Sequence, residues 1–402
     1  MFNTVLFLIS GMVVMFMAAG FCMLEAGLVR SKNAATICVK NIALYSVAGL
    51  MVWIVGYNLI YGGDNAGMSG HFFSPLSFFY QGDDTKPVEL GYGAYSDWFF
   101  QMVFVATAAS IVSGTLAERI KLFPFLIFVA VLTGVIYPVV AGWEWGKGYL
   151  DAKWAFSDFA GSTLVHSTGG WAALAGAIVL GPREGKFGSG QVSAMPGSSL
   201  PLATLGTFIL WLGWFGFNGG SQLALGTIED AFSVAKIIVN TNMAACGGVI
   251  AALILTRVVY GKVDLTIVLN GAIGGLVVIT AEPLTPNIGT SVLFGAIGGA
   301  VVTFAVPVLD KFKIDDVVGA IPAHLFCGIV GTLVVPITNS SATFGGQFVG
   351  VALTGVFVMS TSFALWTALK YTLGIRASAN DEMLGLDKAE LGLEAYPEFS
   401  KG

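Results

Sequence analysis

The 402-residue chain has little charge: Lys, Arg, Asp and Glu make up 11% of it, where about 25% is usual in soluble globular proteins. So few charges cannot cover a water-soluble globule of this length, which argues against a cytosolic enzyme or a disordered protein. The net charge of −5 offers no basic surface for nucleic acid. Hydrophobic residues make up 55% of the chain. The composition therefore indicates a polytopic membrane protein surrounded by lipid.

Cysteine and histidine are also scarce. The four cysteines lie in apolar runs and form no CxxC pair, so small buried packing residues are expected rather than a disulfide framework. Two of the three histidines lie in apolar stretches, without a third histidine or an acidic residue in helical register. Because metal sites need about three or four ligands, we expect no metal and no cofactor. The cysteines are Cys22, Cys38, Cys246 and Cys327, and the histidines are His71, His166 and His324.

Eleven apolar stretches are long enough to cross a membrane, because about 20 residues of helix span a hydrocarbon core of ~30 Å. They must be helices, since lipid leaves exposed backbone groups unsatisfied and no alternating strand pattern appears. The sequence thus predicts an all-α polytopic membrane protein with eleven transmembrane helices. The predicted spans are 3–27, 34–61, 98–117, 122–142, 160–181, 199–219, 231–256, 265–282, 291–310, 317–337 and 348–372.

Basic residues predict the orientation of these spans. Alternate loops contain ten Lys and Arg residues, and the opposite loops contain only Lys86, Lys147 and Lys153. Basic loops stay in the cytoplasm. We therefore expect a protein of the cell's inner (plasma) membrane with the N-terminus outside and the C-terminus in the cytoplasm.

An internal repeat surrounds the two histidines of the spans. The pattern Asp-x2-Gly-x4-His-x3-Gly occurs at 158–170 and at 316–328, with His166 and His324 in register. The two copies cross the membrane in opposite directions, as in inverted-repeat transporters with sites near the midplane. Each histidine follows its aspartate by eight residues, or about 12 Å of helix at ~1.5 Å per residue. The two imidazoles should therefore meet near the bilayer centre.

Each histidine has a structural and a functional interpretation. A histidine within a span is often a packed residue with a satisfied hydrogen bond, yet polar groups at that depth are costly and usually functional. We favour function for His166 and His324. His71, in the long loop 62–97, is interpreted as a solvated surface residue, and Glu25 and Glu118 as helix-end ion pairs or caps beside basic loops.

At these residues the chain resembles the ammonium transporter superfamily (Amt/Mep/Rh), specifically the bacterial Amt type. The resemblance covers essentially the whole chain. It implies an inverted 5+5 repeat, about 1–181 and 199–337, plus a final helix at 348–372, within a transmembrane domain of 1–372. It also implies a homotrimer with a pore in each subunit. The most specific stretches are DFAGSTLVHSTGGWAALAGAIVLGPR (158–183), WLGWFGFNGGS (211–221), DDVVGAIPAHLFCGIVGT (315–332), MLEAGLVRSKN (23–33) and LAERI (116–120).

The resemblance also implies roles for individual residues of a transporter, none of them catalytic. His166 and His324 match the family's twin pore histidines, and Phe104 and Phe217 match its two gate phenylalanines. The family's outer substrate site corresponds to Trp145 and Ser221 together with Phe104 and Asp158. Further lining or structural positions are Trp214, Asn218, Asn270 and Thr280.

The implied substrate is ammonium, with ammonia and methylammonium as related species. Trp145 and Phe104 would attract the cation by cation–π contacts of about 0.5–2 kcal/mol, and Ser221 would accept a hydrogen bond from it. Asp158 would provide negative potential or cap backbone amides, and we favour this indirect role over direct contact. Ammonia would then cross an apolar pore, while the twin histidines relay its proton.

Several functions stay open at this point. Electrogenic transport is the expectation, with passive ammonia conduction as the mechanistic alternative. An ammonium sensor on the same fold is the alternative function, although about 30 residues after the last span are too few for a kinase or cyclase domain. A channel for water or urea ranks lowest, because it does not require paired histidines.

The segment 373–402 resembles the family's cytoplasmic regulatory tail, which packs under a neighbouring subunit and often works with a PII-type signalling protein. The similarity lies in Gly374-Ile-Arg376, an acidic run, Gly385-Leu-Asp387 and Ala395-Tyr396. Leu391-Gly392 departs from the family, where His-Gly is common. Deletion of 376–402 is expected to reduce activity or coupling between subunits.

Overall fold

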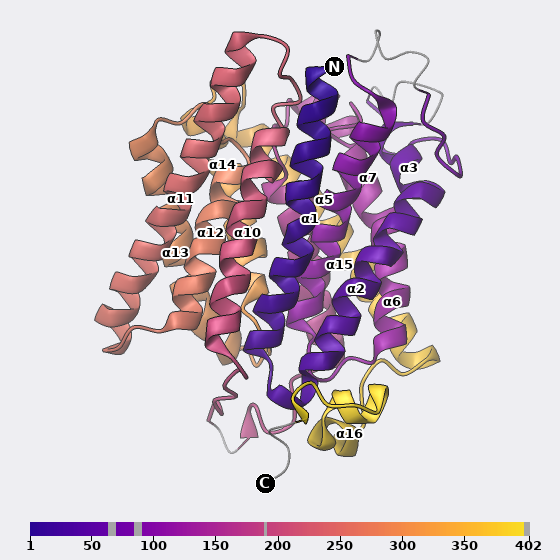
Figure 1. The fold of residues 1–402 in the computed structure, drawn as a ribbon, viewed down its shortest axis with the longest axis vertical. Helices are drawn as coiled ribbons and strands as arrows, with labels where there is room; N and C mark the ends of the chain where they lie inside the picture. The colour runs from indigo at the N-terminus through magenta and orange to yellow at the C-terminus, as the bar shows by residue number, and fades with distance from the viewer. Residues whose placement is uncertain (63–69, 84–90, 189–190, 398–402) are drawn as a thin grey trace.

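The computed structural model describes residues 1–62, 70–83, 91–188 and 191–397, in which the chain is helical. No β-strand occurs in these ranges, and their only strand-type pairing is an isolated bridge between Ile120 and Arg376. The helices stand side by side in one bundle (Figure 1). Helices suit a lipid environment because every backbone group is satisfied within its own segment.

The first half of the bundle contains long helices with π-helical turns inserted into them. Such turns shift the helix register and are frequent at functional sites. The elements are α1 (Phe2–Leu28), η1 (Ser31–Asn33), α2 (Ala34–Met51), η2 (Val52–Gly56), α3 (Tyr57–Tyr61), α5 (Ala94–Thr115), α6 (Leu122–Val131), η3 (Leu132–Ile136), α7 (Tyr137–Gly142), α8 (Tyr149–Trp154), η4 (Ser162–Ser167) and α9 (Thr168–Leu180).

The second half has the same character and ends in a short helical tail. Its elements are α10 (Leu200–Gly220), α11 (Ile228–Tyr260), α12 (Leu265–Thr280), α13 (Ile288–Lys311), η6 (Ile321–Phe326), α14 (Cys327–Val334), η7 (Val335–Ile337), α15 (Phe344–Thr372), α16 (Ala379–Leu384) and η8 (Asp387–Leu391). The turns η2, η3, η4, η6 and η8 are π-helical, whereas η1 and η7 are 3₁₀.

Nine helical segments of the described chain are long and apolar enough to cross a membrane. Two shorter apolar segments, Leu265–Thr280 and Ile321–Ile337, lie where the sequence predicts the remaining two spans. The second is shorter than predicted because residues 317–319 are not helical. The protein is therefore a multi-pass membrane protein with nine to eleven apolar helices.

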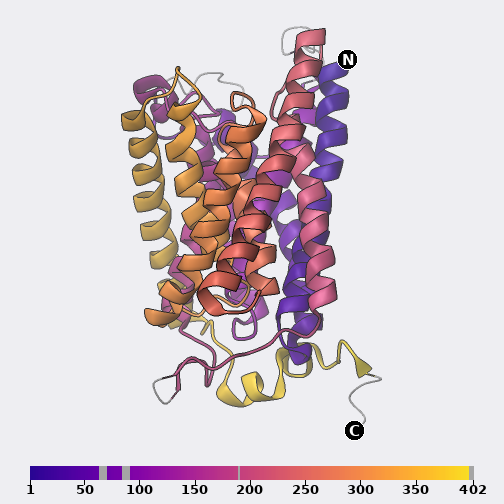
Figure 2. The same cartoon turned by 90° about the vertical axis from the view of Figure 1, so that its left-hand side faces the viewer.

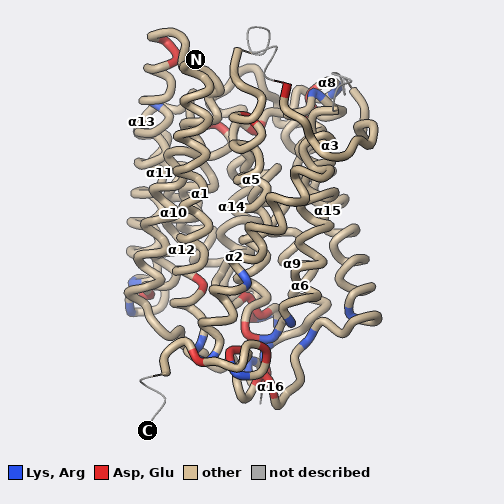
Figure 3. Tube along the Cα trace, turned by 45° about the vertical axis from the view of Figure 1, so that its right-hand side comes forward, with Lys and Arg blue, Asp and Glu red and all other residues tan. Residues whose placement is uncertain are grey.

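Charged residues gather at the two ends of the bundle. Figure 3 shows the middle of most helices free of them, and the densest group lies around α16. We call the end that carries α16 the tail face and the end that carries Met1 the N-terminal face (Figure 1). This distribution matches the high cost of charge inside a bilayer.

Glycine lets the helices of the second half approach very closely. A Cβ atom at Gly295 of α13 would lie 1.8 Å from the carbonyl oxygen of Ala244 in α11. At Gly248 of α11 it would lie 2.1 Å from the carbonyl oxygen of Gly271 in α12. Small residues at such contacts are typical of membrane helices, where packing rather than water drives association.

The cysteines fit the expected packing role only in part. Cys327 is buried, but Cys22 and Cys246 are half-buried and Cys38 is exposed on the bundle surface. The interpretation of all four as buried residues was therefore wrong for Cys38. An apolar run does not distinguish a helix face turned to the core from one turned to lipid.

Ionic contacts tie the loops of the tail face together. The Arg183 guanidinium donates to both oxygens of Asp315, at 2.8 and 2.9 Å. Burial alone would raise the pKa of Asp315, but the hydrogen bonds and charge of Arg183, with the charge of Arg119, outweigh burial and hold this pKa well below its usual range. Glu118 pairs with Arg30 and Arg183, as expected. Glu25 forms no ion pair in the described chain, so its expected pairing was wrong.

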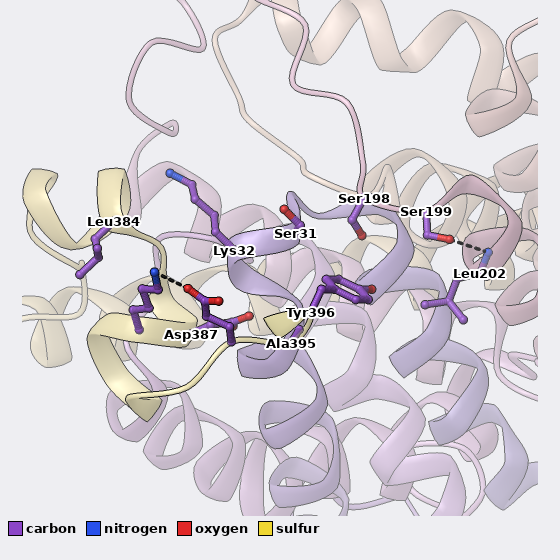
Figure 4. A pocket seen from close by; sticks show the side chains of 11 residues that line it. Ser31, Lys32, Ser198, Ser199, Leu202, Leu384, Asp387, Ala395 and Tyr396 are labelled. Carbon is purple, nitrogen blue, oxygen red and sulfur yellow. Dashed lines mark hydrogen bonds and ion pairs between the residues drawn. The ribbon is translucent and has the colours of Figure 1, made fainter. Parts of the chain in front are cut away.

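The C-terminal tail lies across the tail face of its own chain (Figure 2). The Asp387 carboxylate accepts hydrogen bonds from the Ala35 and Thr36 amides at 2.9 and 2.7 Å, where α2 begins. Glu390 accepts from the Leu122 amide, where α6 begins. Figure 4 shows the adjoining pocket between the tail and the α1–α2 loop, with Tyr396 near Ser198. The tail thus caps two helices of the bundle.

Candidate functional site

The two histidines meet in the interior of the bundle. Nδ1 of His166 lies 3.2 Å from Nδ1 of His324, and the ring centroids are 5.2 Å apart at an interplanar angle of 24°. Both side chains are buried. At this separation one Nδ1 donates and the other accepts, which leaves one neutral imidazole with a proton on Nε2 and the other without.

Each histidine is positioned by a π-helical turn with the same preceding features. His166 lies in η4 and His324 in η6. The glycine five residues earlier has a left-handed backbone in both cases, with φ of +104° at Gly161 and +78° at Gly319. Left-handed backbone is costly for other residue types and easy for glycine. The glycine of the sequence pattern therefore has a conformational role in both copies.

The aspartate of each copy caps the backbone that leads to its histidine. Asp158 is buried and accepts hydrogen bonds from four backbone amides, at 2.7–3.1 Å. Asp316 accepts from the Gly319 and Ile321 amides, at 3.2 and 2.7 Å, and from the Thr115 hydroxyl. Both oxygens of Asp158 accept backbone hydrogen bonds, as a capping role requires. The donors to Asp158 are Gly161, Ser162, Thr163 and Leu164.

Two phenylalanines stack against each other on one side of the histidine pair. The rings of Phe104 in α5 and Phe217 in α10 are 3.8 Å apart between centroids and inclined by only 17°. Both are buried, and the Phe217 ring lies 5.4 Å from the His166 ring. Trp214 stacks on His166 at 4.9 Å. His166 is therefore enclosed by aromatic rings toward the N-terminal face.

The residues expected at the outer site surround this stacked pair. Trp145 is half-buried, 6.1 Å from the Phe104 ring in an edge-to-face arrangement, and its indole N–H donates to the Asp158 carbonyl. Ser221 is half-buried at the end of α10, and its hydroxyl donates to the Phe217 carbonyl at 2.8 Å. The structure thus brings four rings into one series of neighbours, those of Trp145, Phe104, Phe217 and His166. Ser221 is hydrogen-bonded to the backbone carbonyl of Phe217.

The additional positions have polar contacts within the protein. The Trp214 indole donates to the Thr280 hydroxyl at 2.7 Å. Asn218 donates to the Thr241 hydroxyl, and Asn270 donates to the Val318 carbonyl. These bonds join α10 to α12 and α11, and α12 to the segment that precedes η6. His71 is exposed, as expected for a solvated loop residue.

Sequence reasoning missed the surroundings of His324 on the tail-face side. The Phe21 ring lies 5.8 Å from the His324 ring. A small cavity beside His324 is lined by Phe21, Glu25 and Asn270, among others. Glu25 is one of the few charged residues within the predicted spans, and that position was the available signal for it.

The sequence model of the Ammonium Transporter Family matches residues 5–396 of this chain. Ammonium transporter Amt2 of Archaeoglobus fulgidus is 41% identical, over 98% of this chain and 87% of the relative. Ammonium transporter Amt1 of Haloferax mediterranei is 37% identical, over 99% of this chain and 80% of the relative.

Solved structures with the same fold lead to the same group of proteins. A structure described as a sensor Amt protein is 33% identical with a TM-score of 0.88, over 96% of this chain and 98% of that chain. Mep2 of Candida albicans is 27% identical with a TM-score of 0.86, over 100% of this chain and 92% of that chain. The chain therefore belongs to the ammonium transporter family, a family of transporters rather than enzymes.

Proposed function

We propose that this protein transports ammonium selectively across the membrane by deprotonating it and passing ammonia and the proton along linked routes. The observation that carries the proposal is the direct contact between His166 and His324, 3.2 Å apart at Nδ1, behind the stacked Phe104–Phe217 pair. An apolar enclosure with two touching imidazoles suits a neutral molecule that exchanges protons, not a bare cation.

Recruitment of the cation would occur at the N-terminal face. Trp145 and Phe104 present aromatic rings, and cation–π attraction contributes about 0.5–2 kcal/mol depending on desolvation. The Ser221 oxygen, whose proton is donated to the Phe217 carbonyl, is left to accept a hydrogen bond from ammonium. Asp158 would act indirectly, because its carboxylate holds the backbone that positions His166.

The two histidines present different groups to ammonia, because one Nε2 accepts a hydrogen bond and the other donates one. When His166 donates from Nδ1, its Nε2 is an acceptor and Nε2 of His324 is a donor. Ammonia can then donate to one Nε2 and accept from the other. Transfer of the shared proton between the two Nδ1 atoms exchanges these roles. A proton taken up at His166 can therefore leave from His324.

Selectivity over potassium follows from the same geometry. Moving an unpaired charge from water into an apolar enclosure costs many kcal/mol. Ammonium avoids this cost by releasing a proton before it passes Phe217. Potassium has no proton to release, so the enclosure excludes it. Methylammonium can release a proton too and is expected as a bulkier substrate.

We further propose the architecture that the family relationship suggests. It has eleven membrane-spanning helices, an inverted repeat (about 1–181 and 199–337) plus a final helix at 348–372, and a homotrimer with a pore in each subunit. The matching π-turns of η4 and η6 support the repeat. The N-terminal face would lie outside the inner (plasma) membrane, and the tail 373–402 would regulate transport in the cytoplasm, with a PII-type protein as partner.

Currents measured from purified protein in liposomes test the proposal. An ammonium concentration jump should give a saturable current, and a matched potassium jump should give none. Ammonia uptake without charge movement would replace electrogenic transport with passive conduction. Absence of both current and ammonia flux would reject transport.

The second candidate function is ammonium sensing. It is favoured by the similarity to a structure described as a sensor Amt protein, of which this chain covers 98%. Ammonium binding that is intact without any flux would support it.

A further inference from the structure

A small buried cavity adjoins the histidine pair on its tail-face side. It lies between α1, α5 and α12 and reaches His324 at one end. Most of its lining is apolar, with Phe21, Leu24 and Ile273 among the residues. Glu25 is the one carboxylate among the described residues that line it. Ammonia leaving His324 toward the tail face would therefore meet a single acidic group.

The two oxygens of Glu25 have different surroundings. Oε2 accepts hydrogen bonds from the Ser113 hydroxyl at 2.7 Å and from the Asn41 amide at 3.2 Å. Oε1 has no hydrogen-bond partner among the described residues, although the side chain is fully buried. A buried polar atom without a partner is costly by about 1–3 kcal/mol. One oxygen of Glu25 is thus fixed, and the other is available to a proton or a donor in the cavity.

We propose that Glu25 is the proton-transfer group at the tail-face end of the ammonia path, an inference that rests on the proposed transport function. An ammonium at Phe217 first gives a proton to Nε2 of His166, and the shared proton moves from Nδ1 of His166 to Nδ1 of His324. The N–H bond at Nε2 of His324 then breaks, and an O–H bond forms at Oε1 of Glu25. That O–H bond then breaks as ammonia forms its fourth N–H bond. Ammonium leaves toward the tail face, and Glu25 is again a carboxylate. The histidine pair is then neutral with its roles exchanged. Ammonia that accepts the proton from Nε2 of His166 and donates one to Nε2 of His324 restores it, as the shared proton returns from Nδ1 of His324 to Nδ1 of His166.

The charges around Glu25 allow both of its protonation states. Lys40 of α2 is the neighbouring cation, and its ammonium group donates to the Ser113 carbonyl at 2.7 Å. The other titratable neighbours are Cys22 of α1, Cys38 of α2 and His324 of η6. Lys40 offsets the negative charge of the Glu25 carboxylate. When Glu25 is protonated, the hydrogen bond to the Ser113 carbonyl still holds the Lys40 ammonium group in place. A purely structural Glu25 would serve only as a counter-charge to Lys40.

The variant Glu25→Gln separates proton transfer from this structural role. Its amide oxygen can still accept from Ser113, but the group cannot carry an exchangeable carboxyl proton. Because general acid–base groups contribute about 10²–10⁴-fold, the ammonium current should fall by about 100-fold while ammonium binding persists. The current of the parent protein should respond to pH on the tail-face side, and this response should vanish in E25Q. Glu25→Asp should restore part of both.

Two further variants keep the test decisive. E282Q makes the same change at a buried glutamate whose oxygens accept from Leu284, Thr285 and Asn339, and it should retain the parent current. E25Q combined with Lys40→Met removes both charges, so it tests the carboxyl if E25Q alone unfolds. A folded E25Q or double variant with parental current and pH response overturns the role of Glu25. A parent protein without any ammonium-dependent flux instead overturns the transport function itself.

Discussion

The two histidine-bearing segments, 158–167 and 316–326, share their local structure but not their surroundings. Each begins with a capping aspartate and a left-handed glycine, and each places its histidine in a π-turn. His166 is enclosed by the rings of Trp214 and Phe217. Besides His166, His324 has one aromatic ring contact in the described part of the chain, with Phe21, and it adjoins a cavity that contains a carboxylate.

This difference shows how one repeated motif can serve two tasks. The shared cap and π-turn position each imidazole, and the two rings are in contact. In the proposed mechanism the unequal surroundings give the pair a direction. The stacked rings on the side of His166 would exclude a hydrated ion, and the carboxylate on the side of His324 would accept the proton that the pair passes on.

The largest expected effect comes from removing either imidazole. His166→Ala or His324→Ala should each reduce the ammonium current by about 100-fold or more, because proton relay needs both rings. In both variants the remaining current should discriminate less against potassium. Liposome currents with ammonium and potassium jumps measure both effects. Unchanged current and selectivity in either variant would contradict the relay.

The two caps should differ in their contribution to stability. Asp158→Ala leaves four buried amides without an acceptor, whereas Asp316→Ala leaves two amides and the Thr115 hydroxyl. Each buried donor without a partner costs about 1–3 kcal/mol. D158A should therefore lower the thermal unfolding midpoint in detergent more than D316A does. Equal midpoints would show that the two caps are energetically equivalent.

A smaller difference is expected between the two left-handed glycines. A Cβ at Gly161 would lie 2.4 Å from a methyl carbon of Val165, whereas a Cβ at Gly319 would lie 2.7 Å from the side-chain amide nitrogen of Asn270. Left-handed backbone costs an alanine about 1–2 kcal/mol at both positions. Val165 is β-branched and buried. The end of the Asn270 side chain can give way, although this weakens its hydrogen bonds to the Thr266 and Val318 carbonyls. Unfolding midpoints should rank G161A below G319A, and the reverse order would contradict this account.

The pairing of His166 with His324 was predictable because it depends on spacing. The repeated Asp-x2-Gly-x4-His pattern, together with the number of spans between its copies, implied opposite directions and a common depth, and the structure brings the two rings together. Membrane helices and their approximate bounds were predictable for the same kind of reason, since a bilayer imposes length and apolarity.

The surroundings of the pair could not be read from spacing. The π-turns η4 and η6 pack against α12 and against each other, and no local residue pattern predicts this packing. The apolar cavity beside His324 unites Phe21, Glu25 and Asn270 from α1 and α12. A glutamate near a helix end suggested an ion pair, and only the fold shows that Glu25 faces the interior. Likewise, an aspartate at the start of a helix can either cap backbone amides or attract a cation. The four amides that donate to Asp158 favour the capping role.

The smallest expected effect on stability compares one aromatic ring from each side of the pair. Phe217→Leu removes the stack with Phe104, worth about 0.5–1.5 kcal/mol beyond its buried area. Phe21→Leu removes only a tilted contact with His324, whose centroid lies 5.8 Å away. F217L should therefore lower the unfolding midpoint slightly more than F21L does. The functional contrast is sharper: F217L should raise the potassium leak relative to ammonium current, while F21L should leave this ratio near the parental value. An equal leak in both variants would mean that exclusion of hydrated ions is shared by both sides of the histidine pair, and the asymmetry would then rest on Glu25 alone.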